Sequence, residues 1–290
     1  MLTSLEPLIN GILLGGLYAV IGIGLSMIFG IMRQVNLAHG ELMILASYFS
    51  LVFLQLLGVH PLVTFLFVLP ATFILGYLIQ TFLFNRVLEK GMEPYLMISF
   101  GLSIILQNAM LLLFTPDART LQTGLAIKSI NVFDLFHVPV IYLVDFITGL
   151  LVLGLLYLIM KKTYLGWAIR AASDNLTAAR LMGINPKRVY ALAMGIAVIT
   201  AAISGVLVGM TFTFYPHSGT QYLIIAFGVV IIGGLGSLPG TFLGGLILGV
   251  SQLVGGRVIG PGLQLLSGYI ILLIVLTIRD ARGLLLRLFS

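Results

Sequence analysis

The chain of 290 residues contains no cysteine and very little charge. Without cysteine it can form no disulfide, no thiolate nucleophile and no cysteine-ligated metal site. Only 8% of its residues are charged, whereas soluble domains carry about 25%. Hydrophobic residues make up 60% of the chain and the mean hydropathy is +1.16, which is more apolar sequence than a soluble core absorbs. These features predict a membrane protein.

Two motifs that would indicate an enzyme are missing. The sequence has no G-x-x-x-x-G-K-[ST] loop to cradle nucleotide phosphates and no nucleophile elbow. We therefore expect the chain not to be an enzyme and not to hydrolyse ATP by that route. His60, His137 and His217 stand apart in apparent loops, so no metal site is predicted. The net charge of +6 is more typical of basic cytoplasmic loops than of nucleic-acid binding.

Long apolar stretches follow one another along the whole sequence. A β-barrel would show alternating segments of about ten residues, but these stretches are continuous for about twenty residues, as a spanning helix requires. We predict a single all-α domain over residues 1–290, a polytopic bundle of about eight or nine membrane segments with interrupted or re-entrant helices. The expected segments cover residues 8–31, 44–57, 62–84, 95–114, 140–160, 191–214, 222–232, 241–254 and 263–278. In the first segment, Gly11 and Gly15 form a small-xxx-small pair that permits close helix packing.

Residues 161–190, which we call the basic island, form a polar stretch between apolar runs. They hold six of the fifteen Lys and Arg residues and one acid, Asp174. Alanine-rich sequence favours helix, Asp174 or Asn175 can cap one, Gly183 can end it, and Pro186 can begin the next. We predict a short helix that lies across the cytoplasmic face and is offered to another protein.

The distribution of basic residues predicts the sidedness of the chain. The positive-inside rule places the basic island and the Arg-rich tail beyond residue 278 in the cytoplasm. Residues 85–94 then also lie inside, whereas residues 115–139 and the N-terminus lie outside.

Two polar breaks interrupt the apolar sequence, NLAHGE at 36–41 and GGLGSLPG at 233–240. Paired breaks in the two halves of a transporter point to a substrate site built from discontinuous helices, although no strong repeat relates the halves here. His39 and Glu41 bring an imidazole and an acid together at membrane depth, where ionisable groups are functional candidates. Capping of a helix N-terminus by Glu41 is an equally good interpretation.

The fourth segment carries Ser99, Ser103 and Gln107 on one helix face, and we call these residues the polar stripe. In lipid such groups should face protein or water, so the polar stripe can line a path or join helices by hydrogen bonds. We predict that both breaks meet the polar stripe and form a substrate path. The candidate path residues are Asn36, His39, Gly40, Glu41, Ser99, Ser103, Gln107, Asn108, Gly234, Gly236, Ser237 and Gly240.

Four stretches together resemble the permease subunits of branched-chain amino acid ABC importers. They are NLAHGE at 36–41, ISFGLSIILQN at 98–108, RAASDNLTAARLMGINPKRV at 170–189 and GGLGSLPG at 233–240. The resemblance covers most of the chain, with the motifs in the expected order and at fitting spacing. The wider family includes permeases for urea, short amides and, more distantly, monosaccharides.

The resemblance implies a multi-pass subunit of the bacterial inner membrane that moves branched-chain or related small amino acids by alternating access. It implies a second homologous permease as partner, which makes a heterodimer, together with two cytoplasmic ATPase subunits, an external substrate-binding protein and membrane lipid. No nucleic acid is involved. This chain would bind no cofactor, since ATP and Mg are used by the ATPase subunits. Urea or short amides remain alternative substrates, and an ion-coupled secondary transporter or a passive channel is a less favoured class.

In such permeases a cytoplasmic loop with an Ala-Ala…Gly pattern docks into the ATPase. Ala178, Ala179, Gly183 and Asn185 match that pattern, while Thr177 stands where many importers have a glutamate. The resemblance therefore implies a coupling loop at about 161–189. Its implied contact residues are Arg170, Asp174, Asn175, Ala178, Ala179, Arg180, Gly183, Ile184 and Asn185.

Overall fold

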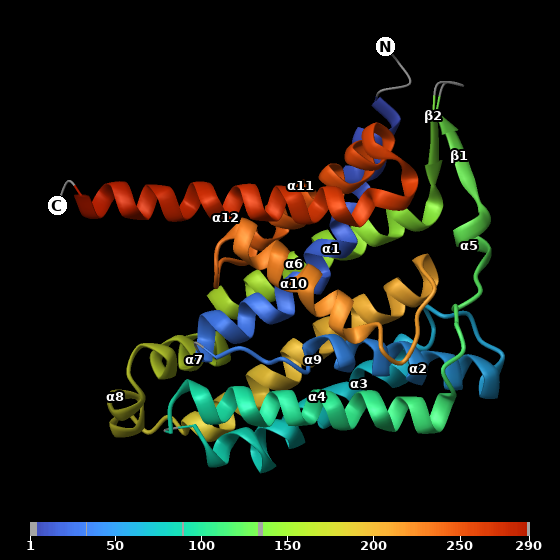
Figure 1. Cartoon of the computed structure of the whole chain (residues 1–290). Helices are drawn as coiled ribbons and strands as arrows, with labels where there is room; N and C mark the ends of the chain where they lie inside the picture. The colour runs from blue at the N-terminus through green and yellow to red at the C-terminus, as the bar shows by residue number, and fades with distance from the viewer. Residues whose placement is uncertain (1–4, 33, 89, 133–135, 289–290) are drawn as a thin grey trace.

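The computed structural model describes residues 5–32, 34–88, 90–132 and 136–288, with the side chains of 32, 132, 261 and 279–288 outside the description. The described chain is almost entirely helical (Figure 1). Within it, seven helices are long and apolar enough to cross a membrane: α1 (Leu5–Met32), α2 (His39–Leu57), α3 (Phe65–Phe82), α4 (Met92–Phe114), α6 (Val140–Lys162), α9 (Pro186–Thr211) and α11 (Leu238–Ile259). Two further helices have shorter apolar stretches, α10 (Gly219–Gly233) and α12 (Gln264–Leu288). The predicted all-α polytopic bundle is confirmed.

Small elements connect the long helices. The basic island contains α7 (Tyr164–Asp174) and α8 (Leu176–Leu181). Between α4 and α6 the chain forms α5 (Gly124–Ile127) and an antiparallel hairpin of β1 (Ser129–Val132) and β2 (Phe136–Pro139). The 3-10 turns η2 (Phe84–Arg86) and η3 (Pro261–Leu263) follow α3 and precede α12.

Helix α1 occupies the centre of the bundle and packs antiparallel against α11. Gly11 lies against Val250 and Gly15 against Leu246, so the two backbones touch without side chains between them. A Cβ atom at Gly15 would lie 2.6 Å from the Leu246 Cα atom, and one at Gly249 would lie 2.6 Å from the Gly15 backbone nitrogen. The close packing predicted for Gly11 and Gly15 is confirmed, and it depends on the absence of side chains.

Two further helix pairs complete the core around α1. Helix α6 runs beside α1, where Gly16 abuts the backbone at Phe146 and Gly149. Helix α3 packs antiparallel along α9, with Gly76 against Val198. Because α9 is also buried along most of its length, α1 and α9 form the interior, while α4 lies at the surface with most of its residues at least partly exposed.

The second segment begins earlier than predicted. We expected apolar helix from residue 44, but α2 starts at His39, and both His39 and Glu41 are buried in its first turn. The reason is local. Asn36 accepts hydrogen bonds from the N–H groups of Ala38 and His39, and these bonds form a turn from which the new helix begins.

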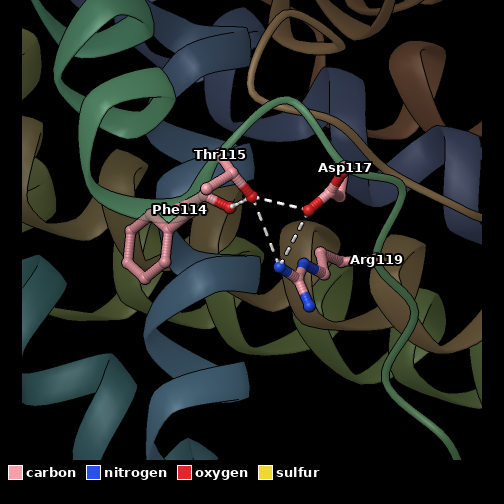
Figure 2. Close-up of polar contacts among 4 residues, drawn as sticks. All are labelled: Phe114, Thr115, Asp117 and Arg119. Carbon is pink, nitrogen blue, oxygen red and sulfur yellow. Dashed lines mark hydrogen bonds and ion pairs between the residues drawn. The ribbon is translucent and has the colours of Figure 1, made fainter.

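The two ends of the bundle carry different elements. In Figure 1, α7 and α8 lie at one end, and the far end of α12 extends to the same side, while α5, β1 and β2 lie at the other. The chain leaves α4 through a polar turn at this second end (Figure 2), in which the Thr115 hydroxyl donates to the Asp117 carboxylate at 2.8 Å and Arg119 Nη2 donates to the same oxygen at 3.4 Å. Backbone bonds between Arg119 and Phe214 join this turn to the residues after α9. The basic island and residues 115–132 and 136–139 are therefore at opposite ends.

The contact between α1 and α11 yields a stability prediction. We expect Gly15→Leu to lower stability by at least about 1–3 kcal/mol, the usual cost of overpacking a filled core, because its side chain has no space beside Leu246. The measurement is the temperature of thermal unfolding in detergent. Gly154→Leu is the matched control, since nothing lies within 4 Å of a Cβ there. Equal unfolding temperatures for the two variants would contradict the proposed contact.

The separation of the two ends yields a topology prediction. Because the chain has no cysteine, Ser129→Cys and Thr177→Cys each place one thiol at an exposed position at opposite ends of the bundle. We expect a membrane-impermeant maleimide, added to intact cells, to label position 129, and to label position 177 only after the membrane is permeabilised. Labelling of position 177 in intact cells would reverse the predicted sidedness.

Candidate functional site

The first candidate site is the turn between α1 and α2. The Asn36 side-chain oxygen accepts a hydrogen bond from the Ala38 N–H at 3.0 Å, and the Asn36 carbonyl accepts one from the His39 N–H at 3.3 Å. Asn36 is fully buried, and its amide nitrogen lies 4.0 Å from the Met194 sulfur of α9. The helix break thus satisfies its own backbone groups at membrane depth, as a break inside a bilayer must.

His39 links the start of α2 to α1. Its Nε2 atom lies 3.1 Å from the Ile21 carbonyl oxygen. Because a carbonyl can only accept, Nε2 carries the proton in this bond. The other ring nitrogen has no hydrogen-bond partner in the part of the chain that the structure describes, and the side chain is fully buried. The geometry gives His39 a structural task, which is to hold the broken end of α2 against an unbroken helix.

Glu41 lies where two helix N-termini meet. It is in the first turn of α2, and its backbone and carboxyl group lie against Gly219, the first residue of α10. Gly40 also abuts Gly219, so neither position has room for a side chain. Helix N-termini favour negative charge, and this arrangement supports the capping interpretation of Glu41.

The carboxyl group of Glu41 also reaches beyond its own helix. Its Oε1 atom accepts from the Thr220 hydroxyl at 3.4 Å, and the Ser103 hydroxyl of the polar stripe interacts with it as well. Its Oε2 atom has no hydrogen-bond partner among the described residues. Thr220 is exposed and Ser103 is half-buried, so these groups approach the surface of the chain. We call Glu41, Ser103 and Thr220 the carboxyl cluster.

The other residues of the fourth segment divide between two environments. Ser99 is buried and bonds within its own helix, to the Leu96 carbonyl. Gln107 is half-buried on the same face as Ser103. Asn108 is exposed and donates to the Ile104 carbonyl one turn earlier. Its place beside the path stays a prediction.

The second break lies apart from the carboxyl cluster. Gly234 and Gly236 adopt φ values of 96° and 82°, and Gly236 packs against Gly30 of α1. Ser237 accepts a bond from the Gly240 N–H at 3.1 Å and so begins α11. The residues form a tight turn between two helices, where glycine supplies the left-handed backbone. The predicted meeting of both breaks at the polar stripe is not found among the described residues, because this turn lies beside Gly30 and the α7 residues Ser173 and Asp174.

The second candidate site is the basic island. Helix α7 folds back across the end of α6, with Gly166 against the Met160 carbonyl. Arg170 Nη1 donates to that carbonyl at 2.6 Å. The Ser173 hydroxyl donates to the Gly30 carbonyl at 3.3 Å. One face of α7 is buried, and α7 is tied to both α6 and α1.

Helix α8 projects beyond α7. Asn175 accepts from the Ala178 N–H at 3.0 Å and caps its start, and Gly183, with a φ of 80°, ends it. Leu181, the last residue of α8, and Met182, which follows it, are 84% and 82% exposed, so the C-terminal tip of α8 is apolar. An exposed apolar patch at the tip of a polar segment is typical of a contact surface for another protein.

The cap residues predicted in the basic island are confirmed, but the single predicted helix is two. Asn175 separates α7 from α8, and Asn185 and Pro186 begin α9. Ala179 is buried and packs inward, whereas Asp174 and Ala178 are exposed and Ile184 is half-buried. Arg180 is exposed at the surface and already makes an interaction within the chain.

Sequence reasoning missed three buried polar residues. Asp145 lies in the second turn of α6, fully buried, and its Oδ2 atom accepts from the Thr211 hydroxyl at 3.1 Å. An acid inside a membrane segment was a signal available in the sequence. Tyr18 donates to Gln252 at 2.5 Å across the contact between α1 and α11. No pattern in the sequence pairs these two residues.

The described residues contain no group of three His, Asp or Glu side chains that could hold a metal ion. The arrangement instead provides a buried carboxyl group beside two hydroxyls and an exposed apolar helix tip at one end. Such features suit the passage of a small polar solute and contact with a protein, in a chain built from membrane-spanning helices.

Comparisons with known proteins agree with this arrangement. The sequence model of the family described as "Branched-chain amino acid transport system / permease component" matches residues 8–278. The "High-affinity branched-chain amino acid transport system permease protein BraD" of Pseudomonas aeruginosa is 32% identical, with 95% of this chain and 94% of that protein covered. No solved structure matches the chain.

Two further relatives have similar names. The "High-affinity branched-chain amino acid transport system permease protein LivH" of Salmonella typhimurium is 30% identical over 94% of this chain and 93% of its own length. The "Probable branched-chain amino acid transport permease protein LivH" of Methanocaldococcus jannaschii is 26% identical over 84% of this chain and 78% of its own length.

With its spanning helices, the chain is a multi-pass protein of the inner membrane. It belongs to the branched-chain amino acid transport system permease component family.

Proposed function

We propose that this chain is the membrane-spanning subunit of an ATP-driven importer for branched-chain or related small amino acids. The observation that carries the proposal is the near full-length similarity to permease proteins whose names state branched-chain amino acid transport. The partners we propose are a second, related permease, two cytoplasmic ATPase subunits and an external binding protein. ATP and Mg would be used by the ATPase subunits.

The structure of the basic island supports contact with an ATPase subunit. Helix α8 is held between the Asn175 cap and the left-handed Gly183, which fixes its direction. Leu181 at its end and Met182 directly after it are apolar and exposed. A groove of about 540 Å³ lies beside it, lined by Arg180 and by the residues from Gly183 to Lys187. A short rigid helix with an apolar tip can insert into a cleft of a partner and move with it.

The carboxyl cluster supports a path at the surface of this chain. Thr220 is exposed and both Ser103 and Gln107 are half-buried, although they lie on apolar helices. Polar groups in this position would face hydrocarbon unless another protein covers them, which is costly in a bilayer. A second permease packed here would enclose the groups and complete the path. Alternating access would then open this path to one side of the membrane at a time.

The exposed tip of α8 yields a coupling prediction. Leu181→Glu places a charge on the apolar contact surface and should reduce leucine uptake by at least about tenfold, since burying an unpaired charge at an interface costs several kcal/mol. Uptake is measured in cells that produce the complete importer. Leu181→Met is the control, because it keeps an apolar side chain of similar volume.

The proposed contact between α8 and the ATPase also predicts why Leu181→Glu loses uptake. Leu181→Glu should leave the amount of this chain in the membrane unchanged and abolish the coupling of ATP hydrolysis to transport. Normal uptake by Leu181→Glu, with expression equal to that of Leu181→Met, would show that α8 does not contact the ATPase.

The carboxyl cluster yields a transport prediction. Glu41→Gln preserves the shape of the side chain but replaces the carboxyl group with an amide, and we expect the rate of leucine uptake to fall by about tenfold or more. Glu93→Gln is the matched control, because Glu93 also lies in the first turn of a helix but is exposed. The amount of assembled complex is measured for both variants. Full uptake by Glu41→Gln would contradict a role of Glu41 in transport and would leave capping of the helix N-terminus as its role.

A further inference from the structure

The C-terminal end of α6 carries two basic side chains without an acidic partner. Lys161 and Lys162 are the last two residues of this helix, and both are exposed. From residue 146 to residue 173 the sequence contains these two lysines and Arg170 but no Asp or Glu. Among the described residues the one ion pair joins Arg119 to Asp117, so neither lysine is paired with a carboxylate there. The two ammonium groups can therefore bind an anion from outside the chain.

The Lys161 side chain extends back along α6, toward the apolar part of the helix. Its Nζ atom donates to the Tyr157 hydroxyl, one turn earlier, at 2.9 Å and lies 5.2 Å from the centroid of that ring. A lysine at the edge of a membrane normally keeps its ammonium group in water. This ammonium group instead lies beside an exposed tyrosine, a residue type typical of the headgroup level. The bond to Tyr157 uses one of its three N–H donors, which leaves two for an acceptor from the membrane.

Helix α7 adds aromatic rings to the same corner of the molecule. Trp167 Nε1 donates to the Lys161 carbonyl at 3.2 Å, and Arg170 donates to the Met160 carbonyl. These bonds satisfy two carbonyl groups at the end of α6 and so offset the negative helix end, which would otherwise repel an anion. The rings of Trp167 and Tyr164 remain exposed. Exposed tryptophan and tyrosine at the end of a spanning helix are typical of contact with lipid headgroups.

An apolar stripe on α6 leads to the two lysines. Leu151, Leu155 and Leu158, which we call the leucine stripe, are 59%, 60% and 54% exposed. Their spacing of four and three residues places them on one face of the helix. Lys161 and Lys162 continue this face, three and four residues after Leu158. The described chain thus leaves an apolar surface uncovered, with two cationic groups at one end of it.

A phospholipid has the two chemistries that this surface accepts. Its acyl chains are apolar and can lie along a spanning helix, and its phosphate accepts charge-assisted hydrogen bonds from ammonium groups. Lysines next to a spanning helix attract anionic lipids in particular. Because the leucine stripe belongs to a spanning helix, a soluble partner does not reach it, in contrast to the exposed tip of α8.

We propose that the end of α6 is a binding site for an anionic phospholipid. The headgroup phosphate accepts hydrogen bonds from Lys161 and Lys162 beside the rings of Tyr157 and Trp167, and an acyl chain lies along the leucine stripe. The inference goes beyond the proposed function, since it requires only that the chain spans a membrane. It gives the corner between α6 and α7 a lipid contact that is distinct from the protein contact of α8.

The test uses the fluorescence of Trp167, which is the only tryptophan in the chain and lies in the site. The full-length chain is reconstituted in vesicles of equal parts phosphatidylglycerol and phosphatidylcholine with matched acyl chains, of which one lipid is brominated to quench tryptophan at close contact. We expect brominated phosphatidylglycerol to quench more strongly, with a relative affinity about tenfold or more above that of phosphatidylcholine. The double variant Lys161→Gln, Lys162→Gln should lose this preference.

The double variant Arg86→Gln, Lys90→Gln is the matched control. Both residues are exposed and lie just beyond the spanning helix α3, so the variant loses the same charge at the end of another helix. An acid, Glu93, follows these two bases closely in the sequence. The control should keep the wild-type preference for phosphatidylglycerol.

Three results would overturn the inference. The first is equal quenching of the wild-type chain by the two brominated lipids, and the second is an unchanged preference in the double lysine variant. The third concerns glycerol phosphate, which carries the same anion without acyl chains. If an excess of glycerol phosphate abolishes the preference, the site takes a free phosphate and not a lipid.

A second measurement identifies what covers the leucine stripe in cells. A benzoylphenylalanine in place of Leu155 attaches to its neighbour on irradiation. We expect the main product to be the chain with a phospholipid attached, recognised by its mass. A protein adduct as the main product would show that another chain covers the stripe, and the lipid site would then be wrong.

Discussion

The constraint on which this structure depends is the absence of water around the backbone of a membrane helix. Every N–H and C=O group released by a break must find a partner inside the protein. At the first break, Asn36 supplies the bonds that the backbone lost, and His39 attaches the new helix to α1. At the second, Ser237 does the same for α11. The breaks persist because side chains within or beside them complete their hydrogen bonding.

A second requirement follows, which is that helices must approach closely enough to cover those breaks. Glycine provides the close approach, at Gly15 between α1 and α11 and at Gly40 between α2 and α10. Without these contacts the first turn of α2 would be separated from α10, and Glu41 would lose its position beside Thr220. The carboxyl cluster thus depends on packing between residues that themselves carry no functional group.

Local signals in the sequence predicted local structure well. Asn175 and Pro186 appear at the helix ends where a cap and a first-turn proline were expected, because both effects depend on a few neighbouring residues. The separation of the two breaks was not predictable in this way. It depends on which helices lie side by side, and apolar segments with even hydrophobicity do not specify their neighbours. The pairing of Tyr18 with Gln252 was hidden for the same reason.

The anchoring of α7 determines how a displacement would travel through the molecule. Arg170 fastens it to the end of α6, Ser173 to α1, and Ala172 accepts a bond from the Tyr190 hydroxyl of α9 at 3.1 Å. A helix fixed at three points cannot swing about one of them while the others stay in place. A push on α8 would therefore be shared among three spanning helices and tilt them as one rigid block, without bending any of them singly.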